Sequence, residues 1–385
     1  MTGASVIVVG GGILGATTFW ELAREDVDVL LLDAGRVGRG STARSAAIVR
    51  CHYSNPEVVR LALRSREMLR QLPLRLDCDP VYTRTGWLFL VDEHDAALAV
   101  ANAEMQQGEG LESVDVEDLQ AVLPGVDERG IAYALLEPES GFADPVATTK
   151  AYADAGVRAG GVLRESTRVD ELVVDSGTLR GVRVSGDLLE CDALVLAAGP
   201  WSAGLAATAG VELPLEITRE QDVLFETAPE PTVPCAVSSQ VDRVYLRPDG
   251  DGRLLAGRGF PKEYERVDPD GYDEHLDVAF GADVHARLAA RLPRLAGARV
   301  TDGRAGLYDV TPDWHPLLGP VEGVEGLHLA CGGSGHCFKL GPAIGELVAN
   351  ELMGRKLQHA AVGTFALSRF AEGRELRSTY GGNRA

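Results

Sequence analysis

The chain has 385 residues, of which 45% are hydrophobic and 24% are charged, and its formal net charge at pH 7 is −20. This composition is that of a globular protein, and the length favours two domains over a single core. The acidic excess argues against nucleic acid or an anionic membrane as a partner, since both would be repelled. No apolar run approaches the length of a membrane span and no basic, apolar leader precedes the first predicted strand, so we expect a cytoplasmic protein.

The most informative stretch lies at the N-terminus. Aliphatic residues 6–9 lead into three glycines, and a helix-compatible segment then leads to a second apolar run, 27–32. In such a unit Gly10 allows the tight turn, Gly12 lets the backbone approach a pyrophosphate, and Gly15 lets the helix pack closely. Asp33 ends the second run, where a carboxylate binds ribose hydroxyls and repels a 2′-phosphate. The stretch predicts FAD or NAD rather than NADP; the alternative is an ordinary strand–helix–strand unit.

Residues 40–50 (GSTARSAAIVR) contain few large side chains until the segment ends at an arginine. Such a segment can run close beneath a flat cofactor, and Ser41 and Thr42 could bond its phosphates or ring. The alternative is a surface loop. Asn55 and Pro56 then form a typical N-cap and first helical position, and they predict a helix start.

The middle of the chain alternates between helical and extended patterns. A β-rich segment covers 81–91, and the last of the strands that follow ends in Ala197-Ala198-Gly199-Pro200-Trp201, where the chain could touch the cofactor a second time. We expect helices at 93–107, 116–123 and 147–159 and strands at 166–174, 179–184 and 193–196.

Residues 215–255 alternate apolar and polar side chains, as half-buried antiparallel strands do. Tyr245 and Arg247 share one face of such a strand and could line a pocket. A cross-strand contact on the sheet face is an equally good interpretation. A helix is expected at 283–292.

The second informative stretch is C-terminal. A strand at 327–330 precedes CGGSGHCFK, and a helix is predicted from Gly341-Pro342 to about Met353. The positive end of that helix could stabilise negative charge on a reduced flavin ring. The alternative reading is a turn-capping His336 and a solvated Lys339. The cysteines have no CxxC or metal-ligand spacing, so we expect free thiols.

In order along the chain, the GGGILG turn with Asp33, the IVRxxYSNP-like segment, AAGPWS, TPDWHP and SGHxFKLxPAIGE resemble the D-amino acid oxidase-type FAD amine oxidoreductases. Within them, the chain is most similar to the sarcosine oxidase and dimethylglycine dehydrogenase-like branch. The resemblance covers nearly the whole chain. It implies an enzyme that removes hydride from a carbon attached to an amine and gives an imine that water hydrolyses.

The resemblance also assigns site residues. It implies that Arg50 and Lys339 hold the substrate carboxylate, an arrangement that a two-pronged guanidinium and a point-charge ammonium suit chemically. Val169 would contact the adenine end of the cofactor. The expected catalytic residues are Arg50, Lys339, His336, Tyr245 and Arg258. The expected cofactor contacts are Gly10, Gly12, Ile13, Leu14, Gly15, Asp33, Ala34, Ser41, Thr42, Ala47, Val169, Ala198, Gly199, Trp201, Gly333, Ser334, Gly335, His336 and Lys339.

Three positions depart from the family pattern. Gly306 stands where monomeric sarcosine oxidases carry the cysteine that binds flavin covalently, so FAD is expected to be dissociable, with Cys51 or Cys337 as minor alternatives for a thiol near the ring. Ala47 replaces an arginine three residues before Arg50. The lysine that activates oxygen would fall near Leu255 and Ala256, where there is none; Arg258 is a substitute, or electrons pass to another acceptor.

The prediction is therefore an α/β protein with a Rossmann-type FAD-binding domain (residues 1–80, 146–212 and 301–385) interleaved with a substrate domain on a largely antiparallel sheet (81–145 and 213–300). It would oxidise a carboxylate-bearing secondary, N-alkyl or α amine, with oxygen or another electron acceptor. Glycine-like, proline-like and N–N bonded substrates all suit the clamp, and an oligomer is compatible with it. The alternatives are an amine dehydrogenase and a non-catalytic FAD subunit of a larger complex.

Overall fold

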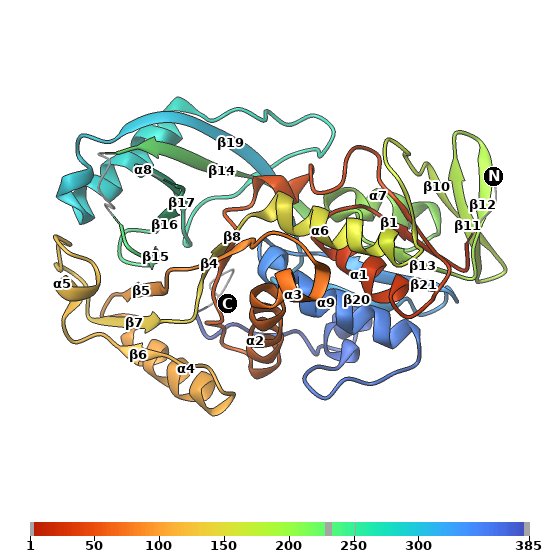
Figure 1. Ribbon diagram of the computed structural model, residues 1–385, viewed down its shortest axis with the longest axis horizontal. Helices are drawn as coiled ribbons and strands as arrows, with labels where there is room; N and C mark the ends of the chain where they lie inside the picture. Colours follow the sequence, from red (N-terminus) through yellow and green to blue (C-terminus); the bar gives the residue numbers. More distant parts are fainter. Residues whose placement is uncertain (1–3, 228–232, 251, 381–385) are drawn as a thin grey trace.

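The computed structural model describes residues 4–227, 233–250 and 252–380. Two large sheets, each with its own helices, lie at opposite ends of the long axis (Figure 1). Residues 228–232 and 251 belong to the stretch predicted to alternate, and they lie outside the described residues. Among the described helices, none combines the length and the apolar character needed to cross a bilayer.

The first sheet has the predicted strand–turn–helix–strand unit at its centre. Its neighbours are parallel except for the antiparallel pair at one edge, β20 and β21. In spatial order the six strands are β20 (Leu317–Pro320), β21 (Leu327–Cys331), β13 (Ala193–Leu196), β1 (Val6–Val9), β2 (Val29–Leu32) and β9 (Val162–Arg164).

Helices cover one face of this sheet. Helix α1 (Ile13–Ala23) buries all 11 of its residues because α6 (Pro145–Arg158) and α9 (Cys337–Leu352) both pack on it. The approach to α9 is close: a Cβ on Gly345 would lie 2.3 Å from the Thr17 Oγ1. On the other face lie α7 (Ser202–Thr208) and an antiparallel meander of β10 (Glu171–Asp175), β11 (Thr178–Val184) and β12 (Asp187–Glu190), of which β12 was not predicted.

The second sheet has nine strands. It is antiparallel except where β5 runs parallel to β15, as the alternation of residues 215–255 indicated. Its order is β18 (Glu265–Arg266), β14 (Glu216–Glu226), β17 (Arg253–Arg258), β16 (Val244–Pro248), β15 (Ala236–Ser239), β5 (Trp87–Val91), β7 (Tyr133–Glu137) and β6 (Val114–Asp115), and β19 (Arg299–Val310) pairs with β14. The predicted domain limit at residue 301 falls inside β19, and the domain limits as a whole stay a prediction.

Helix α8 (Val278–Arg291) covers this sheet and begins five residues before the predicted start at 283. The remaining helices are α2 (Pro56–Arg70), α3 (Leu72–Leu76), α4 (Ala96–Gly108) and α5 (Leu119–Val122), with short 3₁₀ turns η1 (Ser41–Arg44), η2 (Gly199–Trp201), η3 (Pro293–Leu295), η4 (Val362–Phe365) and η5 (Leu367–Arg369). The predicted N-cap of α2 is confirmed: the Asn55 side chain accepts hydrogen bonds from the N–H groups of Glu57 and Val58, at 3.0 and 3.4 Å.

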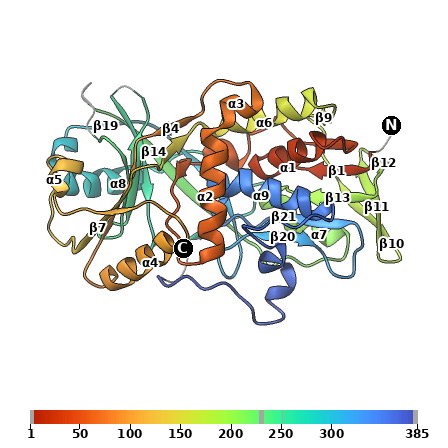
Figure 2. The ribbon, with the colours of Figure 1, turned by 60° about the horizontal axis from the view of Figure 1, so that its bottom comes forward.

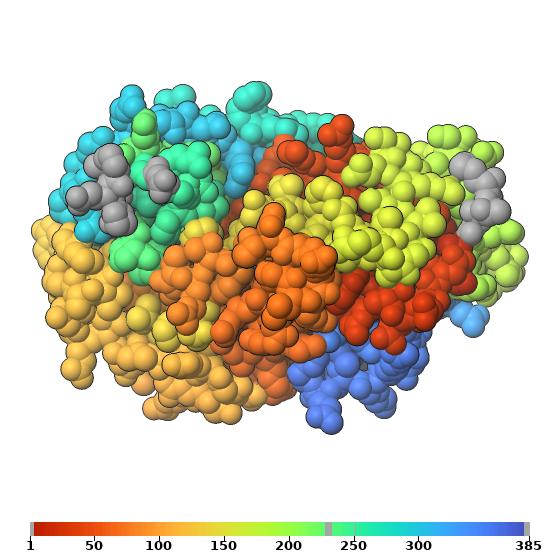
Figure 3. Space-filling model, viewed as in Figure 1, coloured from red at the N-terminus to blue at the C-terminus, as the bar shows by residue number. Residues whose placement is uncertain are grey.

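A third, small sheet of β3 (Ile48–Val49), β8 (Gly141–Ala143) and β4 (Tyr82–Arg84) accompanies the chain where it passes between the two large sheets. Helix α2 stands between the two halves of the molecule in Figure 2, and the orange part of the chain, which includes α2 and α3, covers the middle of the face in Figure 3. Arg50 directly follows β3. The chain therefore delivers this arginine to the junction of the two sheets.

Candidate active site

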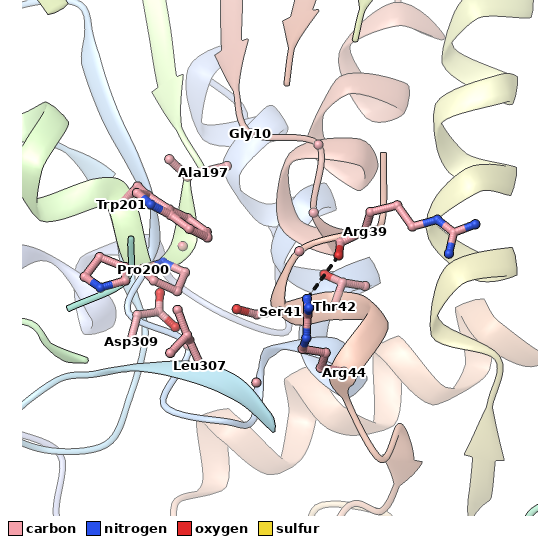
Figure 4. Close-up of a pocket in the computed structure, with 18 of the residues that line it drawn as sticks. Gly10, Arg39, Ser41, Thr42, Arg44, Ala197, Pro200, Trp201, Leu307 and Asp309 are labelled. Carbon is pink, nitrogen blue, oxygen red and sulfur yellow. Dashed lines mark hydrogen bonds between the residues drawn. The ribbon is translucent and has the colours of Figure 1, made fainter. Parts of the chain in front are cut away.

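A cavity of about 900 Å³ opens at the carboxyl ends of three neighbouring parallel strands, β1, β2 and β13. This edge is where open α/β sheets bind their ligands. Gly10 follows β1, Asp33 follows β2, and Ala197 to Gly199 follow β13. We call this space the larger cavity. Figure 4 shows Thr42 and Arg44 on one of its sides and Pro200, Trp201 and Asp309 on the other.

The glycine turn is shaped by close backbone contacts. Gly10 has a φ of +107°, and a Cβ there would lie 2.4 Å from the Ala197 carbonyl oxygen. A Cβ on Gly15 would lie 1.8 Å from the Gly10 oxygen, so α1 packs directly against the turn. Gly12 is the N-cap of α1 and lines the larger cavity. Any side chain at Gly10 or Gly15 would move the turn.

Asp33 is held in a defined orientation beside the turn. Its Oδ2 accepts the Gly11 N–H at 2.6 Å and its Oδ1 accepts the Gly35 N–H at 2.7 Å. Each carboxylate oxygen has a second lone pair. The side chain, which lines the larger cavity, can therefore accept two further hydrogen bonds from a diol.

The larger cavity also has charged walls that the sequence analysis did not single out. It is lined by three arginines that follow β2 within a dozen residues: Arg36, Arg39 and Arg44. This clustering in the sequence could have predicted a phosphate-binding site. The Thr42 hydroxyl accepts the Ile13 N–H at 3.2 Å. On the opposite wall, burial raises the pKa of Asp309 to about 6.

The predicted cofactor residues divide into three groups. Gly15 lines neither cavity, because it packs on the turn. Ala47, Ser334, His336 and Lys339 line the second cavity described below rather than the first. The larger cavity is lined by the others: Gly10, Gly12, Ile13, Leu14, Asp33, Ala34, Ser41, Thr42, Val169, Ala198, Gly199, Trp201, Gly333 and Gly335.

The second cavity, of about 180 Å³, adjoins the first over the large antiparallel sheet, and we call it the smaller cavity. All five predicted catalytic residues line it: Arg50, Tyr245, Arg258, His336 and Lys339. The two cavities share six lining residues, Ser45, Ala46, Tyr245, Tyr308, Gly335 and Phe338. A ligand that fills the larger cavity would therefore present one end to the smaller one.

Arg50 is held by aromatic rings and by one carbonyl. Its guanidinium carbon lies 4.7 Å from the ring centroid of Tyr53 and 5.6 Å from that of Trp87, and it donates a hydrogen bond to the His52 carbonyl oxygen. Behind it the fully buried Glu137 accepts the Cys51 N–H at 2.8 Å. Glu137 thereby anchors the chain next to Arg50, and the sequence analysis missed it, because no local pattern indicates such a buried carboxylate.

Lys339 lies on the first turn of α9, not in a loop. The predicted helix start at Gly341 is wrong, since α9 begins at Cys337 and carries Pro342 inside it. Proline is best tolerated in the first turn, which suggested the later start. The tertiary contact with α1 prevails over that preference: a Cβ on Gly341 would lie 2.5 Å from Ile13 Cγ1.

The charged form of Lys339 is disfavoured by its surroundings. Burial, and secondly the charge of Arg50, lower its pKa to about 7. None of the described residues that line the smaller cavity is a carboxylate. The cavity therefore favours an anionic group between the two cations.

Tyr245 and His336 are neutral groups. The Tyr245 hydroxyl donates a 2.6 Å hydrogen bond to Oδ1 of Asp222, and burial raises the pKa of both side chains. Burial and the Lys339 charge hold the pKa of His336 well below its usual range, and within the described part of the chain neither ring nitrogen has a hydrogen-bond partner. His336 therefore contributes an uncharged ring to the cavity lining, with both ring nitrogens able to hydrogen-bond a ligand.

Two other arginines named from the sequence are already paired in the structure. Arg258 lines the smaller cavity, but its charge is already balanced by an ion pair with Asp283. Arg247 lines neither the larger nor the smaller cavity; it donates to the Ala46 carbonyl oxygen at 2.6 Å and pairs with Asp249 at 2.8 Å. Lys262, which the sequence analysis did not consider, lines the smaller cavity and pairs with Glu220.

All six cysteines are free, as predicted. Cys337 lines the larger cavity and Cys51 lines neither. Burial holds the pKa of the Cys337 thiol well above its usual range, so the thiol stays protonated. A protonated thiol is a poor nucleophile.

Comparison with known proteins gives consistent matches over nearly the whole chain. Residues 5–351 match a protein family described as DAO, FAD dependent oxidoreductase. A glycine oxidase of Pseudomonas putida is 32% identical over 91% of this chain and 94% of its own length. The β subunit of a sarcosine oxidase from an Arthrobacter species is 26% identical over 96% of this chain and 91% of its own length.

Among solved structures, the L-proline dehydrogenase of P. horikoshii superimposes with a TM-score of 0.90 at 27% identity, covering 98% of this chain and 100% of its own.

Proposed function

Because this chain belongs to the family of FAD-dependent oxidoreductases, we propose that it oxidises an amine that carries a carboxylate: a secondary amine, an N-alkyl amine or an α-amino acid. One observation carries the proposal. Arg50 and Lys339 meet in a buried cavity whose described lining holds no carboxylate, directly beside the larger cavity.

The larger cavity fits FAD in size and in chemistry. Its volume of about 900 Å³ is at the upper end for a ligand pocket. The Gly10 turn and the α1 N-terminus suit a pyrophosphate, and Asp33 suits a ribose diol. When bound, FAD supplies the acceptor for the hydride that leaves the carbon beside the amine nitrogen, and the resulting imine is hydrolysed by water.

Arg50 and Lys339 bind and orient the substrate through its carboxylate. The Arg50 guanidinium is fixed by Tyr53 and Trp87, so little entropy is lost when it grips a carboxylate. Lys339 adds a point charge from the first turn of α9. With the carboxylate held by these two cations, the amine end points towards the shared boundary with the larger cavity.

The same charges select the reactive form of the amine. A hydride leaves most easily from a carbon next to a neutral nitrogen, because the nitrogen lone pair forms the new C=N bond as the hydride departs. The cations that line the smaller cavity lower the pKa of a bound ammonium, and no described carboxylate in the lining opposes them. The cavity therefore binds the amine as its free base without a dedicated proton acceptor.

One alternative has support from the comparisons. The structural similarity to an L-proline dehydrogenase, at 27% identity, favours the same chemistry with an acceptor other than oxygen. Both neighbours of the predicted oxygen-activating position, Leu255 and Ala256, are buried apolar residues of β17. Two other cations line the smaller cavity and could take the place of this lysine, Arg258 and Lys262, but both are ion-paired.

The decisive experiment is an anaerobic titration of the purified FAD-loaded protein with amino acids, imino acids, N-alkyl amino acids and N–N linked analogues, followed through the visible flavin band. Bleaching by a carboxylate-bearing amine supports the proposal. Air is then admitted: rapid recolouring identifies an oxidase, and recolouring only with a dye or quinone identifies a dehydrogenase. If none of these compounds bleaches the flavin, the proposal fails and a non-catalytic FAD subunit becomes the better reading.

The lowered pKa of Lys339 predicts a pH dependence for carboxylate binding. Below pH 7 the ammonium is charged and binds the carboxylate fully; above pH 7 a proton must be taken up on binding, because the bound anion raises the pKa again. The Kd of isobutyrate, which has no amine, should rise up to about tenfold per pH unit above pH 7. Calorimetry on the wild type and on Lys339→Arg measures this. The arginine variant should show a flat profile, and a flat wild-type profile would refute the assignment.

FAD should dissociate from the unfolded protein. A Cβ on Gly306 would lie 2.8 Å from the Arg44 Cβ, so Arg44 occupies the space of any side chain at this position, and the Cys337 thiol is held protonated. Acid precipitation of the yellow protein should leave all flavin absorbance in the supernatant. Yellow precipitate that survives washing would show a covalent bond, and a Cys337→Ser variant would then identify its partner.

A further inference from the structure

The C-terminal segment crosses back to the wall of the smaller cavity. It follows η5 and is held by hydrogen bonds at Leu376 and Thr379. The Leu376 N–H donates to Asp313 at 3.1 Å, the Thr379 N–H donates to the Ser54 hydroxyl at 3.1 Å, and Asn102 donates to the Thr379 hydroxyl at 2.8 Å. These bonds place Tyr380, which is only 3% exposed, against strand β5 and the chain that follows β3.

Tyr380 contacts one residue of the cavity wall in two ways. Its hydroxyl and the Nε2 of His52 lie 3.0 Å apart in a hydrogen bond, and the two rings stack with centroids 5.9 Å apart. It also meets Phe89 edge to face at 6.2 Å. Both His52 and Phe89 line the smaller cavity, whereas Tyr380 lies behind them.

His52 is a neutral, packed group and not an acid or base. Burial lowers its pKa to about 3, with the nearby Arg50 charge as the second cause. Its ring lies 4.8 Å from Phe89 and 5.7 Å from Trp87. A ring in this slot sets where the backbone of residue 52 lies, since its other side is closed by Tyr380.

The backbone of residue 52 is the partner of Arg50. The guanidinium donates to the His52 carbonyl oxygen while it stacks on Trp87 and Tyr53, and no carboxylate among the described residues is bonded to it. The direction of the Arg50 guanidinium therefore depends on the His52 carbonyl. Glu137 holds the backbone before this residue and Gln106 donates to the Tyr53 carbonyl after it at 2.7 Å, while Tyr380 holds the His52 ring between these two anchors. The contacts join into one chain from the C-terminal segment to the carboxylate clamp.

We propose that Tyr380 is a positioning residue for the substrate carboxylate: through its bond to His52 it fixes the direction of the Arg50 guanidinium. The inference rests on the proposed function, because it assigns Arg50 to the carboxylate.

The test compares Tyr380→Phe with Thr379→Val. The phenylalanine keeps the ring contacts and removes only the hydroxyl, and the valine loosens the same segment without touching His52. Calorimetry measures binding of two matched probes, isobutyrate and isobutyramide, which differ in the charge that Arg50 recognises. Tyr380→Phe should raise the Kd of isobutyrate about three- to tenfold, the factor expected from one lost hydrogen bond, and leave that of isobutyramide unchanged. Thr379→Val should change neither.

A merely structural role predicts a different pattern. If both probes weaken equally, or if Thr379→Val matches Tyr380→Phe, the positioning role is refuted. With a substrate in hand, Tyr380→Phe should raise KM by the same factor and leave kcat within twofold. If the wild type oxidises no amine but binds isobutyrate, the proposed function fails while the binding comparison still decides the role of Tyr380. If the wild type does not bind isobutyrate, the clamp and this inference both fail.

Discussion

Replacing Arg50 with Met should lower kcat/KM for a carboxylate-bearing amine by about 30- to 5,000-fold, the equivalent of about 2–5 kcal/mol for a buried charge partner. The methionine refills the space between the Tyr53 and Trp87 rings, so the fold is retained and the protein should stay yellow. Most of the loss should be in KM, because the clamp contacts a part of the substrate that does not react. Steady-state kinetics with the substrate found by titration measures it.

Arg258→Met is the matched control for this prediction. Arg258 lines the same cavity, but it is paired with Asp283, and Asp283 keeps its second partner Arg287 at 2.9 Å when Arg258 is removed. Its removal should cost less than about tenfold, since little unbalanced charge is lost. Lys339→Met should behave like Arg50→Met. Equal losses in Arg50→Met and Arg258→Met would contradict the clamp and point to a general effect of positive charge.

Replacing Arg369 with Met should lower the free energy of unfolding by about 3–5 kcal/mol, the cost of leaving a buried charge without its partner. Arg369 is 0% exposed. Its guanidinium donates two hydrogen bonds of 2.8 Å to the Asp313 carboxylate and one of 2.9 Å to the His315 carbonyl oxygen. Asp313 also accepts the Leu376 N–H, so the variant should loosen the segment that ends at Tyr380.

Urea unfolding at a fixed excess of FAD measures this loss, because bound cofactor contributes to the apparent stability. Arg374→Met is the control: its partner Glu372 is on the surface, the Arg374 side chain is 50% exposed, and the change should stay within about 0.5 kcal/mol. If Arg369→Met is no more destabilising than Arg374→Met, the buried pair does not hold the C-terminal segment.

Much of the site could be read from local patterns. The glycine turn needs only consecutive residues: Gly10 has the positive φ that few other residues adopt, and Asp33 lies one strand further on, so spacing places both at one sheet edge. The helix start at Asn55 and Pro56 was likewise predicted from adjacent residues alone. Arg50 and Lys339 were assigned through resemblance to a family, and the structure brings them to one cavity although 289 positions separate them in the chain.

Other features were beyond any local pattern. The predicted start of α9 was four residues too late, because Pro342 favours a position in the first turn of a helix. The helix in fact begins at Cys337, and Gly341 and Gly345 pack closely against α1. Arg258, which the sequence offered as a substitute for the oxygen-activating lysine, is paired with Asp283 on another element. Glu137 and Arg369 look like ordinary surface residues in the sequence, and only the fold buries them.

By itself, the sequence determined the dinucleotide-binding unit and the antiparallel character of the second sheet, because each follows from spacing or alternation within a few residues. The assignment of Arg50 and Lys339 to a substrate carboxylate came from the resemblance to a family and stays a proposal. The tertiary structure alone decided which charges are balanced and which are not. Pairing and burial depend on segments that are distant in the chain, and these set the pKa of Lys339 near 7, keep His52 neutral and connect Tyr380 to Arg50.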